Sequence, residues 1–147
     1  MKRPITPLVS ALCFFVIACG GDAQPDSVQT TNPETVRPQE LPDGDPALAQ
    51  RLVTEEGALL LDVRTPEEYG EDSAEGAVNI PVQALEARIS EVVELLQGDR
   101  QRPIVVYCRS GRRSTIAKEI LLEAGFGQVT NLGPLTAWTG PHATSQP

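Results

Sequence analysis

Short apolar runs divide the chain, and two of the segments between them repeat apolar residues every three or four positions. The runs cover residues 58–63, 76–81, 103–107 and 128–132. The first and third are nearly unbroken, as is typical of parallel strands that are covered on both faces. The helical spacing falls in 85–96 and 116–121. Strands that alternate with helices predict an α/β fold, with a small central parallel sheet flanked by helices on both faces.

Start and stop signals place the ends of several helices. Asp45-Pro46 fits a cap and the first position of a helix, and residues 65–68 (TPEE) fit a capping box. Gly125 is expected to close the helix that follows Ser114. A turn over Pro134–Trp138 is expected to dock Trp138 on the core. His142 is expected to be solvated in a polar tail.

The first residues predict export. Lys2 and Arg3 precede an apolar stretch at 5–18, which has 14 residues and falls short of the roughly 20 that span a bilayer as a helix. This stretch ends in VIACG at 16–20, which resembles a bacterial lipobox. Cys19 is therefore expected to receive lipid and to become the new N-terminus. Ordinary signal cleavage nearby and an uncleaved anchor are the alternatives.

This interpretation divides the chain into four parts. They are a lipoprotein signal peptide at 1–18, a flexible linker with lipidated Cys19 at 19–45, a domain at 46–142 and a tail at 143–147. The linker is rich in polar residues and proline and has too little apolar surface to fold alone. It would tether the domain to a membrane, facing the periplasm of the cell envelope. Inner-membrane lipoproteins carry Asp after the lipidated cysteine, so the resemblance and Gly20 at this position favour the outer membrane if the cell is Gram-negative.

The composition argues against one class of partner and indicates which cysteine is free to react. The formal net charge is −8, which argues against nucleic acid as a partner. Of the three cysteines, Cys13 leaves with the signal peptide and Cys19 takes lipid, so Cys108 remains as the free thiol of the exported protein. A lone thiol in an oxidising envelope suggests use, although buried structural cysteines are a common alternative.

Cys108 lies where a strand ends and a helix begins, in the sequence CRSGRRS at 108–114. Backbone amides at a helix N-terminus point at the group held there, and the helix dipole favours negative charge. These amides and the neighbouring arginines are expected to lower the pKa of the thiol, whose thiolate form is the nucleophile. Gly111 can adopt the positive φ of a tight loop, and Arg112 with Arg113 can bind an oxyanion.

The spacing between Cys108 and Arg113 separates two chemistries. The loop has the pattern Cys-x4-Arg, whereas cysteine phosphatases use Cys-x5-Arg because phosphate needs a wider cradle. Position 114 is serine, which argues against an enzyme acting on arsenate or phosphate esters. The sequence contains no Cys-x-x-Cys pair, which argues against disulfide exchange of the thioredoxin type.

The loop resembles the active-site loop of rhodanese-type sulfurtransferases. Further segments resemble that family in the same order: LDVRTPEEY at 61–69, GAVNIP at 76–81, IVVYC at 104–108, and NLG at 131–133 followed by AW at 137–138. Together they span about residues 47–138. The small size and the signal resemble single-domain periplasmic members. The resemblance implies a rhodanese-like fold, with neither a metal nor an organic cofactor.

The resemblance also implies a double-displacement reaction. Cys108 would take the outer sulfur of a small anionic donor such as thiosulfate, become a persulfide, and pass the sulfur to cyanide or a thiol. The loop would stabilise the persulfide and attract anions through Arg109, Ser110, Gly111, Arg112, Arg113 and Ser114. For Arg109 and Arg112 a solvent-facing position is the alternative, and for Arg113 a solvated position at the helix start. Ser110 and Ser114 can donate hydrogen bonds to the sulfur or cap the helix, and Ser114 is expected to do only the latter.

Asp62 and Arg64 match the family's Asp-Val-Arg strand end. They are expected to support the structure around the loop, with Arg64 paired to Glu67 or Glu68, and direct catalysis is the alternative. An alternative function is a membrane-tethered persulfide carrier or binding module, which hands sulfur to a protein partner with little turnover of small molecules.

Three features depart from the family pattern. Asp72-Ser73 stands where many members carry a histidine, and Gly133-Pro134 replaces a Gly-Gly pair. No strand is evident ahead of the helix that contains Leu48, so the sheet is expected to have one strand fewer than usual.

Overall fold

The computed structural model describes residues 40–144. The predicted signal peptide, Cys19, most of the predicted linker and residues 145–147 lie outside the described residues. Within 40–144, no helix combines the length and apolar character needed to cross a membrane.

Four parallel strands form the central sheet, in the order β3-β1-β4-β5. They are β1 (Leu59–Asp62), β3 (Val78–Asn79), β4 (Ile104–Cys108) and β5 (Val129–Pro134). All four predicted strands are therefore present, and the α/β class is confirmed. In the described part of the chain no strand precedes α1 (Pro46–Glu55), as expected from the missing pattern there.

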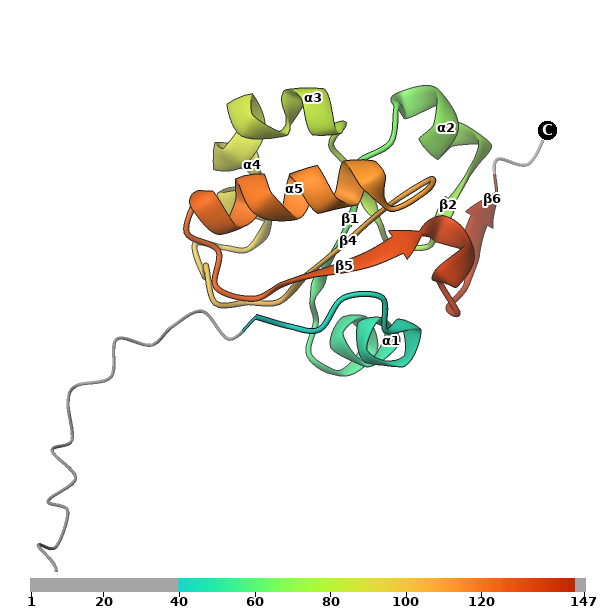
Figure 1. Cartoon of the computed structure of the whole chain (residues 1–147), viewed down its shortest axis with the longest axis horizontal. Helices are drawn as coiled ribbons and strands as arrows, with labels where there is room; N and C mark the ends of the chain where they lie inside the picture. Colours follow the sequence, from blue (N-terminus) through green and yellow to red (C-terminus); the bar gives the residue numbers. More distant parts are fainter. Residues whose placement is uncertain (1–39, 145–147) are drawn as a thin grey trace, which may run out of the picture. The chain divides into compact units, whose positions relative to one another are not determined.

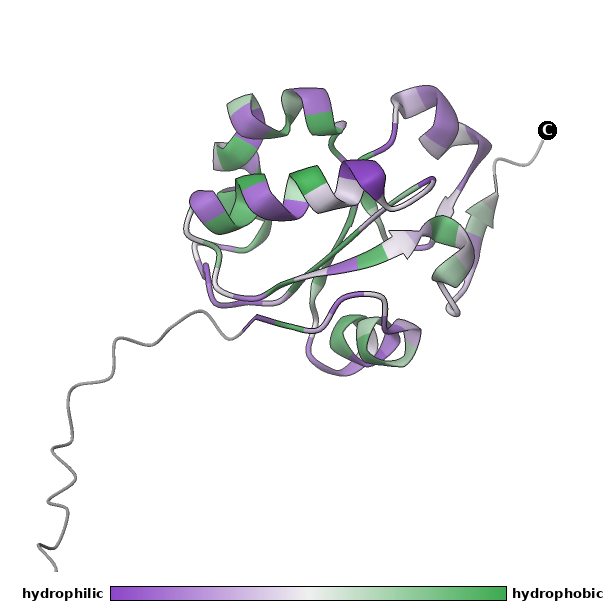
Figure 2. Cartoon of the chain, in the orientation of Figure 1, coloured by the Kyte–Doolittle hydropathy of each residue, from purple (hydrophilic) through white to green (hydrophobic). Residues whose placement is uncertain are grey.

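Helices cover both faces of this sheet (Figure 1). One face carries α1, and the other carries α3 (Val82–Leu85), α4 (Ile89–Leu95) and α5 (Arg112–Glu123). Apolar and polar residues alternate along these helices (Figure 2), and each helix buries an apolar residue, namely Leu52 of α1, Leu85 of α3, Val92 of α4 and Leu121 of α5. The short helix α2 (Pro66–Glu71) follows β1.

Side chains of β4 alternate between two apolar clusters, although the strand is fully buried. Ile104, Val106 and Cys108 pack on the side of α5, whereas Val105 and Tyr107 pack on the side of α1. The two-residue period of a strand explains this alternation. The alternation also fixes the direction of Cys108, whose side chain points to the face of the sheet that α5 covers.

The predicted caps are confirmed. Asp45 accepts a hydrogen bond from the Leu48 amide at 3.0 Å. Thr65 and Glu68 form the reciprocal bonds of a capping box. Gly125 ends α5 with φ of 87°, a conformation that glycine adopts without strain.

The sequence predicts one continuous helix over 85–96, but the structure has a break within it. A 3-10 turn, η1 (Glu86–Arg88), separates α3 from α4, and Arg88 leaves the helical conformation with φ of −108° and ψ of 20°. Leu85 before the turn and Val92 after it are both fully buried. The break thus lets both segments present apolar residues to the same core.

His142 is exposed, as predicted, but the first residues of the predicted tail form a strand. His142–Thr144 forms β6, which pairs antiparallel with β2 (Asp72–Ala74). The His142 ring lies 3.1 Å from an Asp72 carboxylate oxygen. Ser73, at the departure from the family pattern, is buried and donates to the Ala143 carbonyl. Pairing with the open edge of β2 therefore holds this segment on the domain.

Trp138 packs against the core as predicted. A 3-10 turn, η2 (Leu135–Ala137), precedes it, and only 6% of Trp138 is exposed. Its indole N–H donates to the Pro141 carbonyl at 3.1 Å, which satisfies the one polar group of this buried ring.

The domain begins before the predicted boundary at Pro46. The Gly44 amide donates to the Asn131 carbonyl at 2.8 Å, and the Thr130 hydroxyl donates to the Pro42 carbonyl at 2.7 Å. Asp43 accepts from both the Asn131 amide and the Lys118 ammonium group, each at 2.8 Å. Residues 42–44 are therefore a strap along β5 rather than free linker.

Candidate active site

Cys108 is the last residue of β4, and α5 begins four residues later. The cysteine is fully buried. The preceding residue of β4, Tyr107, pairs with Asp62 at the end of β1. Asp62 and Cys108 therefore both lie at the carboxyl edge of the sheet, where parallel sheets bind ligands.

Gly111 folds the loop back over the sulfur. It has φ of 90° and ψ of −24°, the positive φ that the sequence predicts. Its amide donates to Cys108 Sγ at 3.1 Å, and its carbonyl accepts from the Ser114 hydroxyl at 2.9 Å. A residue with a Cβ is strained at this φ. The glycine therefore sets both the shape of the loop and the direction of one donor to sulfur.

Ser114 also contacts the sulfur, so the prediction that it only caps the helix is wrong. Its Oγ lies 3.5 Å from Cys108 Sγ and its side chain is buried. No side chain caps the N-terminus of α5. The first turn of that helix leaves amides without helical partners, and the Cys108 sulfur lies where such amides point.

The pKa of Cys108 is lowered from its ordinary value. Burial alone would raise it, because a buried thiolate loses its hydration. Hydrogen bonds from the Ser114 hydroxyl and from the amides of Ser114, Ser110 and Gly111 outweigh that effect. The sequence predicts this lowering of the Cys108 pKa. The hydrogen-bond donors, rather than the arginine side chains, make the largest contributions to it.

The arginines of the loop differ in their surroundings. Arg113 forms a double hydrogen bond with the Glu68 carboxylate, at 2.6 and 2.9 Å. Arg109 and Arg112 are exposed, and neither makes an ion pair with the described residues. The structure therefore assigns Arg113 to holding the loop against α2 and leaves the charges of Arg109 and Arg112 unneutralised.

Arg64 pairs with Asp62, so the predicted pairing with Glu67 or Glu68 is wrong. Arg64 Nη2 lies 2.6 Å from Asp62 Oδ2, and the two side chains are 8% and 0% exposed. Arg64 also donates to the Asp72 carbonyl and lies 5.6 Å from the centre of the Tyr107 ring. Burial opposes the charge of Arg64, but the bonds and charge of Asp62 raise its pKa overall.

Two further contacts that the sequence did not predict support the site. Glu68, predicted as a cap and as a possible partner of Arg64, is the partner of Arg113. The Tyr107 hydroxyl accepts from the Ala74 amide at 3.1 Å, and burial raises the pKa of Tyr107 well above its usual range. The capping box located Glu68, but its contact with a helix 45 residues away has no local signal.

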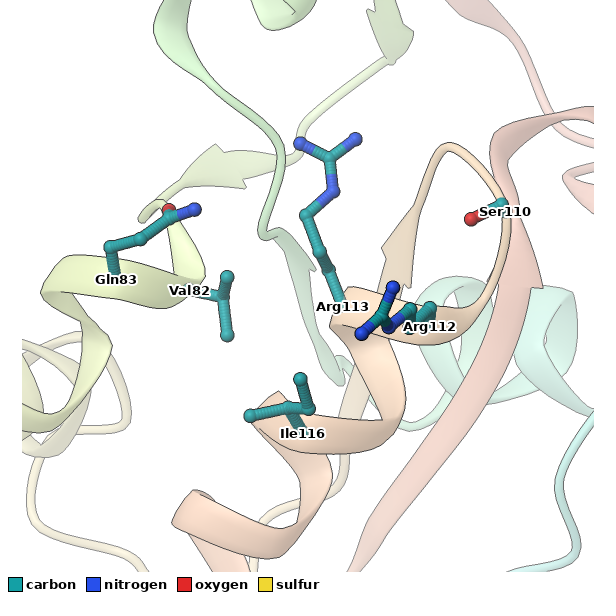
Figure 3. A pocket seen from close by; sticks show the side chains of 6 residues that line it. All are labelled: Val82, Gln83, Ser110, Arg112, Arg113 and Ile116. Carbon is teal, nitrogen blue, oxygen red and sulfur yellow. The ribbon is translucent and has the colours of Figure 1, made fainter.

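A pocket of about 540 Å³ lies beside the loop, between α3 and α5 (Figure 3). It is lined by Val82, Gln83, Ser110, Arg112, Arg113 and Ile116. The pocket thus brings three of the predicted loop residues together with two apolar side chains and one amide. Within residues 40–144, no group of three or more His, Cys, Asp or Glu side chains is placed to hold a metal ion.

The rhodanese-like domain family matches residues 45–140. The chain belongs to the rhodanese-like domain family. This match covers all elements of the central sheet and the whole Cys108 loop.

Similar proteins place the domain among sulfurtransferases. A sulfurtransferase of Allochromatium vinosum is 39% identical over 93 residues, which are 63% of this chain and 81% of the relative. The thiosulfate sulfurtransferase PspE of Escherichia coli is 43% identical over 75 residues, 51% of this chain and 68% of the relative. A solved rhodanese with anions from E. coli has a TM-score of 0.54 at 38% identity and covers 60% of this chain and 99% of that one. These similarities support sulfur transfer as the general activity of this rhodanese-like domain.

The Glu68–Arg113 ion pair should make the stability of the fold depend on pH. Arg113 lowers the pKa of Glu68 from 4.5 to about 2. The pair therefore stabilises the fold fully above pH 4.5 and loses this contribution as the pH falls toward 2. Glu68→Gln is expected to lower the free energy of unfolding by about 1 kcal/mol at pH 7, and urea unfolding at pH 7 and pH 2.5 measures it.

The matched control for this prediction is Glu67→Gln, one residue earlier on the exposed face of α2. The effect of Glu68→Gln should vanish when Arg113 is also replaced by glutamine, whereas the effect of Glu67→Gln should not change. Independent, additive effects of Glu68→Gln and Arg113→Gln would contradict the coupling.

Proposed function

We propose that the protein is a sulfurtransferase that works through a persulfide on Cys108. It moves sulfane sulfur from a small anionic donor such as thiosulfate to cyanide or a thiol. The single observation that carries this proposal is the set of donors on Cys108 Sγ, which comprises the Gly111 amide at 3.1 Å and the Ser114 hydroxyl at 3.5 Å. These donors lower the pKa of the thiol and so favour the nucleophilic thiolate over the thiol.

In the first half-reaction the Cys108 thiolate attacks the outer sulfur of thiosulfate. A bond forms between the two sulfurs, the S–S bond of the donor breaks with its electron pair, and sulfite leaves. The negative charge then rests on the outer sulfur of the persulfide. The exposed guanidinium groups of Arg109 and Arg112 attract the anionic donor to the loop.

In the second half-reaction the acceptor attacks the outer sulfur, and the bond from that sulfur to Cys108 breaks. The thiolate of Cys108 is then the leaving group. The donors that lower its pKa also make it a better leaving group. The same hydrogen bonds thus assist both halves of the cycle, and no external oxidant or reductant is needed.

Mass spectrometry of the protein after thiosulfate treatment tests this proposal. We expect a gain of one sulfur that disappears on adding cyanide and is absent in Cys108→Ala. The rate of sulfur gain should rise with pH and level off below the ordinary cysteine pKa of about 8.5. No sulfur gain at any donor concentration would refute the persulfide. A persulfide that forms but is transferred only to a protein thiol would favour the carrier function instead.

We also propose that the protein is lipid-anchored in the cell envelope through Cys19. The support is the sequence VIACG at 16–20 after an apolar stretch. Fatty-acid labelling in a bacterial host is expected to label the full chain and Cys13→Ser, but not Cys19→Ser. Label that survives Cys19→Ser would contradict the anchor.

A further inference from the structure

The pocket beside the Cys108 loop has an apolar wall. Ile116 on α5 is 44% exposed, whereas the other large hydrophobic side chains among the described residues are buried or half-buried. Val82 on α3 faces it across the hollow (Figure 3). One exposed isoleucine is ordinary, but two apolar side chains on opposite walls of one pocket form a surface for an apolar ligand. The volume of about 540 Å³ is that of a small-molecule site.

The rim of the same pocket has a positive charge that no carboxylate of the described residues neutralises. The Arg113 guanidinium is engaged by both oxygens of Glu68. The Arg112 guanidinium is exposed and has no carboxylate partner within residues 40–144. Gln83, on the opposite side, adds an exposed amide. The pocket therefore offers an apolar wall and an adjacent anion-binding group.

Thiosulfate and cyanide would leave the apolar wall unused, because neither has a carbon chain. We propose that this pocket binds the sulfur acceptor, an organic thiol with an apolar stem and an anionic end. The stem would lie between Val82 and Ile116 and the anionic end at Arg112. Ser110 lines the pocket two residues after Cys108, so the ligand's sulfur would lie beside the loop. This inference rests on the proposed function and adds the class of its acceptor.

The transfer step balances without a further reactant. The acceptor thiolate attacks the outer sulfur of the Cys108 persulfide and forms a new S–S bond. The bond from that sulfur to Cys108 breaks, and its electron pair returns to Cys108 as thiolate. The products are the organic persulfide and the free enzyme.

Two thiols of equal length test the proposal, 6-mercaptohexanoate and 6-mercapto-1-hexanol, with cyanide as the reference acceptor. The full chain is loaded with thiosulfate, and the rate of persulfide loss is measured for each acceptor. We expect the carboxylate to react about tenfold faster than the alcohol, and Arg112→Gln to remove that preference. Ile116→Ala and Val82→Ala should slow both thiols by about fourfold or more, since each buried methylene contributes about that factor, and should leave cyanide within about twofold.

Matched controls separate this proposal from a general loss of structure. Ile120→Ala lies one turn further along α5, outside the pocket lining, and Arg51→Gln lies on α1 at the opposite face. Both should preserve the difference between the two thiols. If the pocket variants slow persulfide loss to cyanide and to both thiols equally, or change none of these rates, the proposed acceptor is wrong. The proposed persulfide on Cys108 would not be affected by that result. Failure to form the persulfide would overturn the proposed function as well.

Discussion

Replacing Asp62 with alanine is expected to lower the free energy of unfolding by about 3–5 kcal/mol. The variant would leave the Arg64 guanidinium, whose side chain is 8% exposed, without its carboxylate. The Arg64 amide would also lose its 2.8 Å bond to Asp62 Oδ1. An uncompensated charge at a buried position is among the costliest single changes in a protein. Urea unfolding at pH 7, followed by circular dichroism, measures the loss.

The exposed ion pair of Arg88 and Glu91 provides the matched control. It has similar geometry, with a closest distance of 2.7 Å, but its side chains are 40% and 39% exposed. Glu91→Ala should therefore cost less than about 1 kcal/mol. If Asp62→Ala costs no more than Glu91→Ala, the buried pair does not hold this edge of the sheet.

Replacing Gly111 with alanine is expected to slow persulfide formation about 10- to 100-fold at pH 7, because the loop would withdraw an amide from the reacting sulfur. Space is not the obstacle, since a Cβ at this position would lie 3.6 Å from the nearest atom, Gly133 Cα. The obstacle is φ of 90°, which costs an alanine about 1–2 kcal/mol. Relaxation of this strain would turn the amide away from Cys108 and raise the pKa of its thiol. Stopped-flow measurement of persulfide formation against pH checks both effects.

Gly98→Ala controls for backbone strain alone. Gly98 follows α4 and has φ of 84°, and a Cβ added there would meet no atom within 4 Å. This variant should lose comparable stability and keep the pH profile of the reaction. Equal slowing of the reaction in both variants would show that lost stability, rather than the Gly111 amide, is responsible.

Local signals in the sequence were sufficient for the elements and for the position of Cys108. Asp45 and the TPEE capping box act within one helical turn, so their residues alone predict them. The apolar run before Cys108 predicts a buried strand, and the helical spacing after it predicts α5. A cysteine between two such elements can only lie at the carboxyl edge of the sheet.

Partners that depend on packing could not be predicted in the same way. Arg64 has several acidic residues nearby in sequence, and the choice of Asp62 follows from burial of both side chains at one strand end. Glu68 meets Arg113 only because α2 lies next to the start of α5. β6 has no apolar pattern, since its pairing with β2 uses backbone groups. Contacts between distant segments of the chain thus account for each of these differences.

The strap at 42–44 has a consequence for association between copies of the domain. β5 is an outer strand of the sheet, and such strands expose amides and carbonyls that can pair with another molecule. The strap occupies both backbone groups of Asn131, with Asp43 on the amide and Gly44 on the carbonyl. The opposite outer strand, β3, has only two residues and is followed closely by Pro81. Both edges are therefore protected against edge-to-edge aggregation, even where many copies are crowded together.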